Sequence, residues 1–381
     1  MPWRSKSVED LRKEFVLAAQ GCSNFSALCR EFKITRKTGM KWCERFENNQ
    51  PLSDQSRSPH TIPNKTPPEV EKLIVNERIN NPGWGAKTIH QVLVNKGHKD
   101  LPCVKTINNI LNRYHLISEE ESLKHQPYKR FERDNCNSLW QTDFKGEFRT
   151  ADGKYCYPLD IMDDCSRFLI RISAYLNTNN VVIPTFKAAF EEYGMPRAVL
   201  SDNGCQFSGF KNGYTQFEKW LMDHDILPIH GRIKHPQTQG KIERFHRTMK
   251  SELLKHNTFA NCAEADIALN EWRNKYNTIR PHQALNMKCP ADVYTPSDRR
   301  YSDIVKPFEY SGTNHIIKVN SWGYVRFGKW QIYLSETMIG EHIEFRANPL
   351  GDSFIACYRN FVIAEFSTEN GKLIHRKISR L

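Results

Sequence analysis

The sequence has no apolar run close to the roughly 20 residues that a membrane-spanning helix requires. Its first ten residues mix Arg4, Lys6, Glu9 and Asp10 and contain no apolar stretch of the kind found in a signal peptide. These two absences predict a cytoplasmic protein with no membrane partner.

Paired cysteines are also missing. The 11 cysteines are scattered, their number is odd, and none forms a Cys-x-x-Cys pair. Neither a disulfide framework nor a zinc knuckle is therefore supported. We expect free thiols in a reducing compartment.

Acidic residues are fewer than basic ones, 43 against 55. The formal net charge is +12, and residues 1–135 carry 23 Lys and Arg against 16 Asp and Glu, which is +7 of the total. A localised cationic excess favours nucleic acid as a partner more than a uniformly basic composition does.

The segment 1–50 contains three short helical patterns between Val8 and Phe46. Thr35 is a suitable N-cap for the third, which is basic. Two short helices followed by a basic third are typical of a helix-turn-helix DNA-binding module, with a plain interaction domain as the alternative. The candidate DNA contacts on this helix are Arg36, Lys37, Lys41 and Arg45.

A proline-rich linker over 51–66 leads to a second helical module, 67–117. We expect helices at 69–79, 86–94 and 104–111. The last carries Lys105, a candidate DNA contact, so the module is either helix-turn-helix-like or a spacer. Residues 118–137 lack periodicity and form a connector.

From residue 138 to 296 strands alternate with helices. Strands are expected at 139–148, 155–162 and 168–175, and shorter strands and helices follow, which predicts an α/β domain with a mixed sheet flanked by helices. Past Pro307 closely spaced short strands predict a small all-β barrel or sandwich over 307–381.

Three acidic residues stand out in the α/β region. Asp143 and Asp202 occupy strand ends, where open α/β sheets place their sites. Glu243 begins a helix whose Ile242, Phe245, Met249 and Leu253 fall at helical spacing and should pack inward. Either Asp alone is more often a turn residue, and Glu243 alone is more often a salt-bridge partner.

Together Asp143, Asp202 and Glu243 offer only hard oxygen ligands, which suit Mg²⁺ or Mn²⁺. The neighbouring Asp163 and Asp164 are rival carboxylates, which we interpret as structural or substrate-orienting.

Several segments resemble the acidic motifs of bacterial insertion-sequence transposases that have a retroviral-integrase-type (DDE) core. They are Leu139-Trp140-Gln141-Thr142-Asp143, Leu200-Ser201-Asp202-Asn203-Gly204 and His235-Pro236-Gln237-Thr238-Gln239-Gly240-Lys241-Ile242-Glu243-Arg244, with Asp163-Asp164-Cys165-Ser166-Arg167 and Arg280-Pro281-His282-Gln283 in support. The resemblance extends over about residues 136–296.

The resemblance implies a ribonuclease-H-like fold, DNA strand cleavage and strand transfer. It also implies two divalent ions held by Asp143, Asp202 and Glu243 as catalytic residues. The partners would be double-stranded DNA, as element inverted repeats and target DNA, and further copies of the chain in a homo-oligomer. Localisation would be cytoplasmic and nucleoid-associated.

Further polar residues near the acidic motifs are candidate contacts to phosphates or bases, and solvated loop positions are the alternative. They are Asn203, Gln237, Lys241, Arg244 and Arg247. The 40 residues between Asp202 and Glu243 exceed the usual spacing, and 209–214 looks like the extra length, a longer loop near the site. The alternative functions are a DNA-binding regulator or domesticated transposase without catalysis, and a nuclease that cuts without joining.

Overall fold

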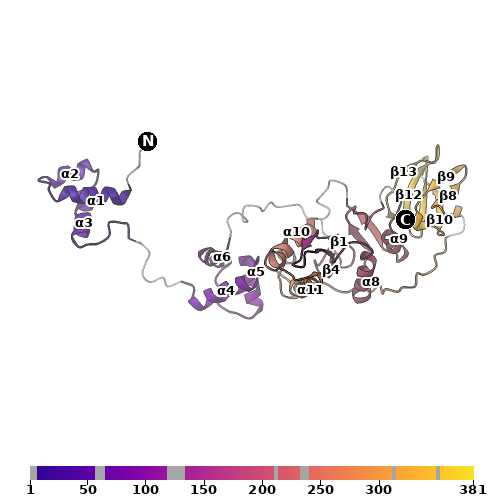
Figure 1. The fold of residues 1–381 in the computed structure, drawn as a ribbon, viewed down its shortest axis with the longest axis horizontal. Helices are drawn as coiled ribbons and strands as arrows, with labels where there is room; N and C mark the ends of the chain where they lie inside the picture. Colours follow the sequence, from indigo (N-terminus) through magenta and orange to yellow (C-terminus); the bar gives the residue numbers. More distant parts are fainter. Residues whose placement is uncertain are drawn as a thin grey trace. The chain divides into compact units, whose positions relative to one another are not determined.

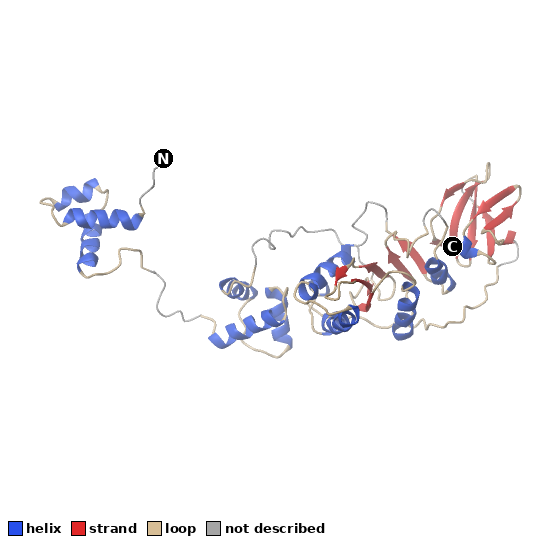
Figure 2. Cartoon of the chain, in the orientation of Figure 1, coloured by secondary structure: helices blue, strands red, loops and turns tan. Residues whose placement is uncertain are grey.

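The computed structural model describes residues 7–55, 65–117, 134–209, 213–231, 240–310, 315–348 and 352–381 (Figure 1). Two compact units make up the chain, Met1–Lys65 and Thr66–Leu381. The elements in the described residues before 118 are helices, strands and helices follow from residue 140, and strands dominate the C-terminal end (Figure 2). None of the helices in the described ranges is both long and apolar enough to cross a membrane.

The first unit contains the three expected helices, α1 (Val8–Ala19), α2 (Phe25–Glu31) and α3 (Arg36–Glu47). Thr35 caps α3 as predicted, because its hydroxyl accepts a hydrogen bond from the Thr38 amide at 3.2 Å. Gly39 permits close helix packing, since a Cβ there would lie 2.8 Å from the Phe15 ring.

The second unit begins with three more helices, within two residues of the predicted bounds: α4 (Pro68–Asn80), α5 (Ala86–Asn95) and α6 (Val104–Arg113). They enclose an apolar cluster, and two buried glutamates beside it have cationic partners. Glu71 pairs with Arg113 at 2.6 Å and Glu77 with Lys96 at 2.7 Å. The core is formed by Ile74, Trp84, Ile89, Val92, Leu93, Ile107, Ile110 and Leu111.

A six-stranded mixed sheet follows, in the order β2-β3-β1-β5-β6 with β4 paired to β3. The strands β1, β5 and β6 are parallel, whereas β3 is antiparallel to β1, β2 and β4. The strands are β1 (Trp140–Phe144), β2 (Phe148–Arg149), β3 (Tyr155–Asp163), β4 (Leu169–Tyr175), β5 (Ala198–Ser201) and β6 (Leu227–His230).

Helices cover both faces of this sheet, as the alternating pattern predicted. One apolar cluster joins β1, β3 and β4 to α8 (Val182–Tyr193) and α9 (Gln216–Asp223). Another joins β3 and β4 to α10 (Gly240–Met249) and α11 (Cys262–Thr278). The short helical turns are η2 (Lys250–Leu254), η3 (Gln283–Leu285), η4 (Pro290–Asp292) and η5 (Glu336–Met338).

The strand predicted over 139–148 is wrong in one respect: it is two strands, β1 and β2, separated by residues 145–147. Gly146 has a φ of +86° there, a conformation that ends an extended strand. The hairpin turn predicted at 151–153 is present, and the Gly153 amide donates to the Thr150 carbonyl at 3.0 Å.

The C-terminal segment is all-β, as expected, but the strands of its described residues do not close into a barrel. One sheet runs β13-β12-β11-β10-β7 with β14 on β12, and β8 and β9 form a separate hairpin. The strands are β7 (His315–Lys318), β8 (Tyr324–Phe327), β9 (Trp330–Tyr333), β10 (His342–Ala347), β11 (Ser353–Tyr358), β12 (Phe361–Ser367), β13 (Leu373–His375) and β14 (Ser379–Arg380).

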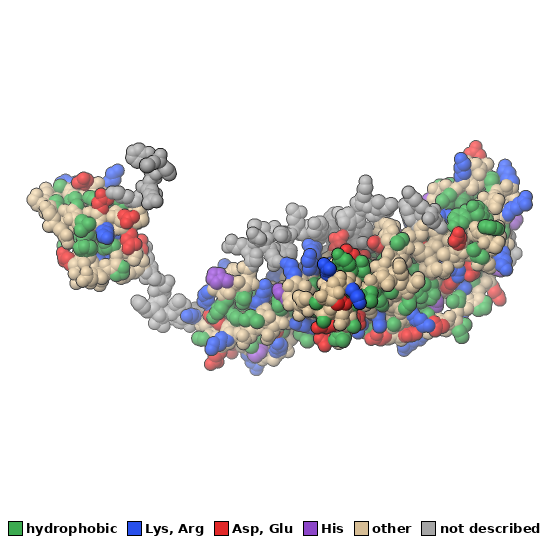
Figure 3. Space-filling view, in the orientation of Figure 1, with side chains coloured by type: hydrophobic (Ala, Val, Ile, Leu, Met, Phe, Trp, Pro, Cys, Tyr) green, Lys and Arg blue, Asp and Glu red, His purple; other side chains and the backbone are tan. Residues whose placement is uncertain are grey.

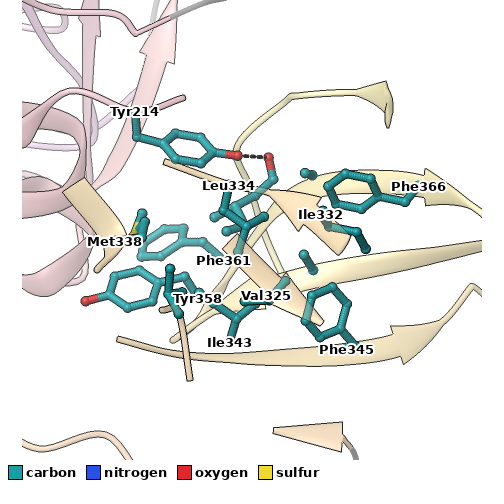
Figure 4. Close-up of a cluster of buried hydrophobic side chains, with 14 of the residues drawn as sticks. Tyr214, Val325, Ile332, Leu334, Met338, Ile343, Phe345, Tyr358, Phe361 and Phe366 are labelled. Carbon is teal, nitrogen blue, oxygen red and sulfur yellow. Dashed lines mark hydrogen bonds between the residues drawn. The ribbon is translucent and has the colours of Figure 1, made fainter. Parts of the chain in front are cut away.

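Tyr214 docks this β module onto the α/β core. It is 5% exposed and belongs to the apolar cluster of the β module (Figure 4). Its hydroxyl donates to the Ile363 carbonyl at 2.6 Å, and its amide donates to the Ser335 hydroxyl at 3.0 Å. The predicted extra length therefore ends in a residue that joins two modules.

Candidate active site

Asp143 lies on β1 between two other carboxylates. It is directly opposite Asp160 of β3. On the other side Gln141 pairs with Leu200 of parallel β5. Asp143 is two residues after Gln141, and Asp202 is two residues after Leu200, just past the end of β5. Burial, followed by the charge of Asp160 and to a smaller extent that of Asp202, raises the pKa of Asp143 to about 7, and His246 opposes the shift.

His246 of α10 connects Asp160 with Asp143. Its Nε2 lies 2.6 Å from Asp160 Oδ2, and its Nδ1 lies 3.9 Å from Asp143 Oδ2. Burial alone would lower the pKa of His246, but Asp160 and then Asp143 raise it above its usual value. Asp160 is fully buried, and its Oδ1 has no hydrogen-bond partner among the described residues. This corner of the core therefore concentrates negative charge around one imidazole.

Asp202 follows the last residue of β5. The Gly204 amide donates to Asp202 Oδ1 at 2.9 Å, which fixes the orientation of the carboxylate. The charge of Asp202 acts on the pKa of Asp143, so the structure brings these two predicted ligands into one neighbourhood.

Glu243 lies on the first turn of α10, three residues before His246, and its side chain is exposed. Residues three apart share one flank of a helix, so Glu243 is on the same flank as the imidazole that reaches Asp143. In the described part of the chain, no three His, Cys, Asp or Glu side chains converge to enclose a metal ion. The structure thus does not bring Glu243 to the two aspartates.

The apolar face of α10 is as predicted. Ile242, Phe245 and Met249 are at most 2% exposed and Leu253 is 9% exposed, while Arg244, Arg247 and Lys250 are exposed. This register of the helix also places His246 toward β1.

The rival carboxylates have structural partners. Asp163 accepts hydrogen bonds from the Asn137 amide and from the Ser166 amide and hydroxyl at 2.6–2.8 Å. Asp164 accepts hydrogen bonds from Gln141 and Lys241, both at 2.6 Å. Both carboxylates therefore connect the end of β3 to neighbouring residues of the core.

The predicted DNA contacts near the site fall into three groups. Lys241 is bonded to Asp164 and its side chain is only 14% exposed, and the Asn203 amide donates to the Gly231 carbonyl at 2.8 Å. Arg244 and Arg247 are exposed on α10. Gln237 lies outside the described residues.

In the helical modules, Arg36, Lys37 and Lys41 line a shallow depression beside α3, and Lys105 is exposed on α6. Arg45 instead turns toward the Ser53 carbonyl at 3.4 Å. On the face drawn in Figure 3, basic and acidic side chains are interspersed. The cations thus do not form one continuous patch on that face.

Asp160 and His246 were not predicted. Asp160 has a weak sequence signal, because a charged residue interrupts the otherwise apolar Leu159-Asp160-Ile161 of a buried strand. His246 has none, since its partner is 86 residues away.

Family profiles match the region that contains the mixed sheet and the candidate site. Two profiles, both described as "Integrase core domain", match residues 134–236 and 224–290. Together they extend over the mixed sheet, α10 and α11.

Curated relatives agree with these matches. An uncharacterized protein of insertion element IS476 from Xanthomonas euvesicatoria is 29% identical over 45% of this chain and 48% of its own length. A transposase for insertion sequence element IS904 from Lactococcus lactis is 23% identical over 61% of this chain and 97% of its own length. The chain spans about half the length of the first curated relatives that it matches.

Among solved structures, the HTLV-2 integrase catalytic core domain in complex with magnesium is 19% identical. That match covers 42% of this chain and 96% of the other, with a TM-score of 0.33.

Proposed function

The chain carries an integrase core domain and resembles insertion-sequence transposases, and from this premise we propose that it is a transposase. It would bind the ends of its element and catalyse metal-dependent cleavage and strand transfer of DNA. The observation that carries the proposal is the placement of Asp143 and Asp202 at the ends of adjacent parallel strands inside the matched core.

The donor set fits a hard divalent cation. Asp143 lies near two further carboxylates, and burial, followed by repulsion from those carboxylates, raises its pKa to about 7. A cation relieves such repulsion, and carboxylate oxygens are the ligands that Mg²⁺ and Mn²⁺ prefer. Asp143, Asp202 and Glu243 would hold two ions, which supply charge neutralisation for in-line displacement at a phosphodiester.

The protein's own residues would orient the reacting groups. Asp160 and His246 hold Asp143 from the interior side, and the Gly204 amide holds Asp202. The exposed Arg244 and Arg247, next to Glu243, would contact the DNA phosphates. The helix α3 would enter the major groove as the recognition helix of a helix-turn-helix, and Lys105 would add a contact from α6.

The test uses the full chain, a duplex carrying an element end, and Mg²⁺. Asp143→Asn, Asp202→Asn and Glu243→Gln should each lower the rate of cleavage by at least roughly 1,000-fold, because each removes a charge needed in the transition state. Affinity for the duplex should stay within about threefold of wild type.

The matched control is Asp152→Asn, an exposed acid in the hairpin turn. It should cleave at the wild-type rate. Normal cleavage by any triad variant would remove that residue from the proposed site. A wild-type protein that shifts the duplex but yields no product would favour the DNA-binding regulator, and nicking without joined product would favour a nuclease.

A further inference from the structure

Gly231, the residue after β6, forms hydrogen bonds with both chain neighbours of Asp202. The residue before it, Ser201, accepts a hydrogen bond through its carbonyl from the Gly231 amide at 3.0 Å. The residue after it, Asn203, donates from its side chain to the Gly231 carbonyl at 2.8 Å. The position of Asp202 is therefore set by the strand next to its own.

His230 adds a side-chain link on the same side. Its Nδ1 lies 3.1 Å from the Ser201 hydroxyl, and its Nε2 lies 2.9 Å from Glu218 Oε1. The Ser201 hydroxyl also donates to the Asp202 carbonyl at 3.2 Å, so it links the imidazole to the backbone of Asp202. Both ends of the imidazole are thereby fixed.

Glu218 is itself immobilised at the start of α9. Its other oxygen accepts hydrogen bonds from the Thr215 amide at 2.6 Å and from the Gly209 amide at 3.0 Å, and its side chain is 4% exposed. Thr215 directly follows Tyr214, the residue that docks the β module. A continuous set of hydrogen bonds thus runs from the docking point to the residue preceding Asp202.

A Ser, His and Glu in this order also resemble a nucleophilic triad. Ser201 is only 2% exposed and lies inside the strand ladder, so no substrate reaches its oxygen. The arrangement suits support of a neighbouring group and not nucleophilic attack.

We propose that His230 is a positioning residue for Asp202. By holding Ser201 against Glu218, it sets where the Asp202 carboxylate lies relative to Asp143 across β5 and β1. The binding of a divalent cation between two carboxylates depends steeply on their separation, and residues that orient ligands affect metal affinity by roughly 10- to 100-fold. This inference rests on the proposed function, in which both aspartates are ligands.

The experiment compares full-length His230→Ala, Ser201→Ala and the double variant with wild type. Each single variant should raise the Mg²⁺ concentration for half-maximal cleavage by about tenfold, with DNA-end affinity in Ca²⁺ unchanged. The double variant should raise this concentration by less than the product of the two single effects, because the two changes share one hydrogen bond. Ser201→Ala deletes one hydroxyl and guards against misfolding of the histidine variant.

His224→Ala is the matched control. His224 is also a partly buried histidine of this domain, and its ring is bonded to the Trp220 and Ser302 carbonyls at 2.8 and 3.2 Å, outside the set of hydrogen bonds that leads to Asp202. It should leave the Mg²⁺ dependence unchanged even if it lowers the melting temperature. An equal Mg²⁺ dependence in His230→Ala and His224→Ala would overturn the proposal.

Hydrogen exchange separates this inference from the proposed function. In His230→Ala and Ser201→Ala, amides in residues 199–206 should exchange faster, while those in 139–145 stay as in wild type. This readout needs no catalysis. Wild-type protein without cleavage would refute the transposase assignment alone, whereas unchanged exchange in 199–206 would refute the role of His230.

Discussion

Two pairs of acidic residues in the mixed sheet have opposite environments: Asp163 and Asp164 at the end of β3, and Asp160 of β3 with Asp143, which is opposite it on β1. Asp163 and Asp164 have donors that satisfy them, supplied by Asn137, Ser166, Gln141 and Lys241. Asp160 and its cross-strand neighbour Asp143 share one imidazole, and one oxygen of Asp160 has no hydrogen-bond partner among the described residues. Satisfied carboxylates serve the scaffold, whereas crowded carboxylates leave charge available for a cation.

The largest effect should come from the satisfied pair. Asp163→Asn replaces an oxygen that accepts hydrogen bonds with an amide whose hydrogens face buried donors from Asn137 or Ser166. The free energy of unfolding should fall by roughly 3 kcal/mol, measured by urea denaturation. A loss below about 0.5 kcal/mol would remove the distinction between the two pairs.

The crowded pair should respond in the opposite direction. Asp143→Asn should increase the free energy of unfolding by about 2 kcal/mol at pH 8 without divalent ions. The folded-state pKa of Asp143, about 7, is above its ordinary value of 3.8, so its ionisation costs stability. That cost is absent below about pH 4, grows as the pH rises from 4 to 7, and is constant above pH 7.

The gain from Asp143→Asn should therefore vanish near pH 4, where wild type and variant should unfold alike. Thermal unfolding at pH 4, 6 and 8 checks this trend. Asp152→Asn, in an exposed turn, should show no such rise, and a gain independent of pH would contradict the assigned cause.

The smallest effect should come from adding the cation. Mg²⁺ at ten times its dissociation constant should stabilise wild type by roughly 1.4 kcal/mol. Asp143→Asn should lose this increment, because it lacks a ligand charge, while Asp163→Asn should keep it despite its lower stability. Melting curves with and without Mg²⁺ distinguish the two variants.

Local patterns predicted most elements of the fold. The apolar spacing of Ile242, Phe245 and Met249 gave the inward face of α10, and Thr35 gave the start of α3. These signals lie within one or two helical turns, where sequence periodicity is informative. The break of β1 at Gly146 was missed, because a single glycine within an otherwise strand-like segment is a weak signal.

Contacts between distant segments could not be predicted. The pairing of Asp160 with His246 joins β3 to α10 across 86 residues, and no periodicity in either segment encodes it. The open sheet of the C-terminal module likewise depends on pairings such as β10 with β7, which short strands alone do not specify. The positions of Asp143 and Asp202 near strand ends of one sheet are, by contrast, a signal that the sequence carries, because each follows an apolar strand pattern.

The docking of Tyr214 also constrains how the chain is made. Its partners Ser335 and Ile363 are synthesised 121 and 149 residues later, so the α/β core leaves the ribosome with this side chain uncovered. Met222 belongs to the same apolar cluster and is likewise covered only after the C-terminal strands are synthesised. A chain that ends prematurely before β12 would keep an exposed apolar surface, and early termination should therefore give aggregated protein instead of a free catalytic core.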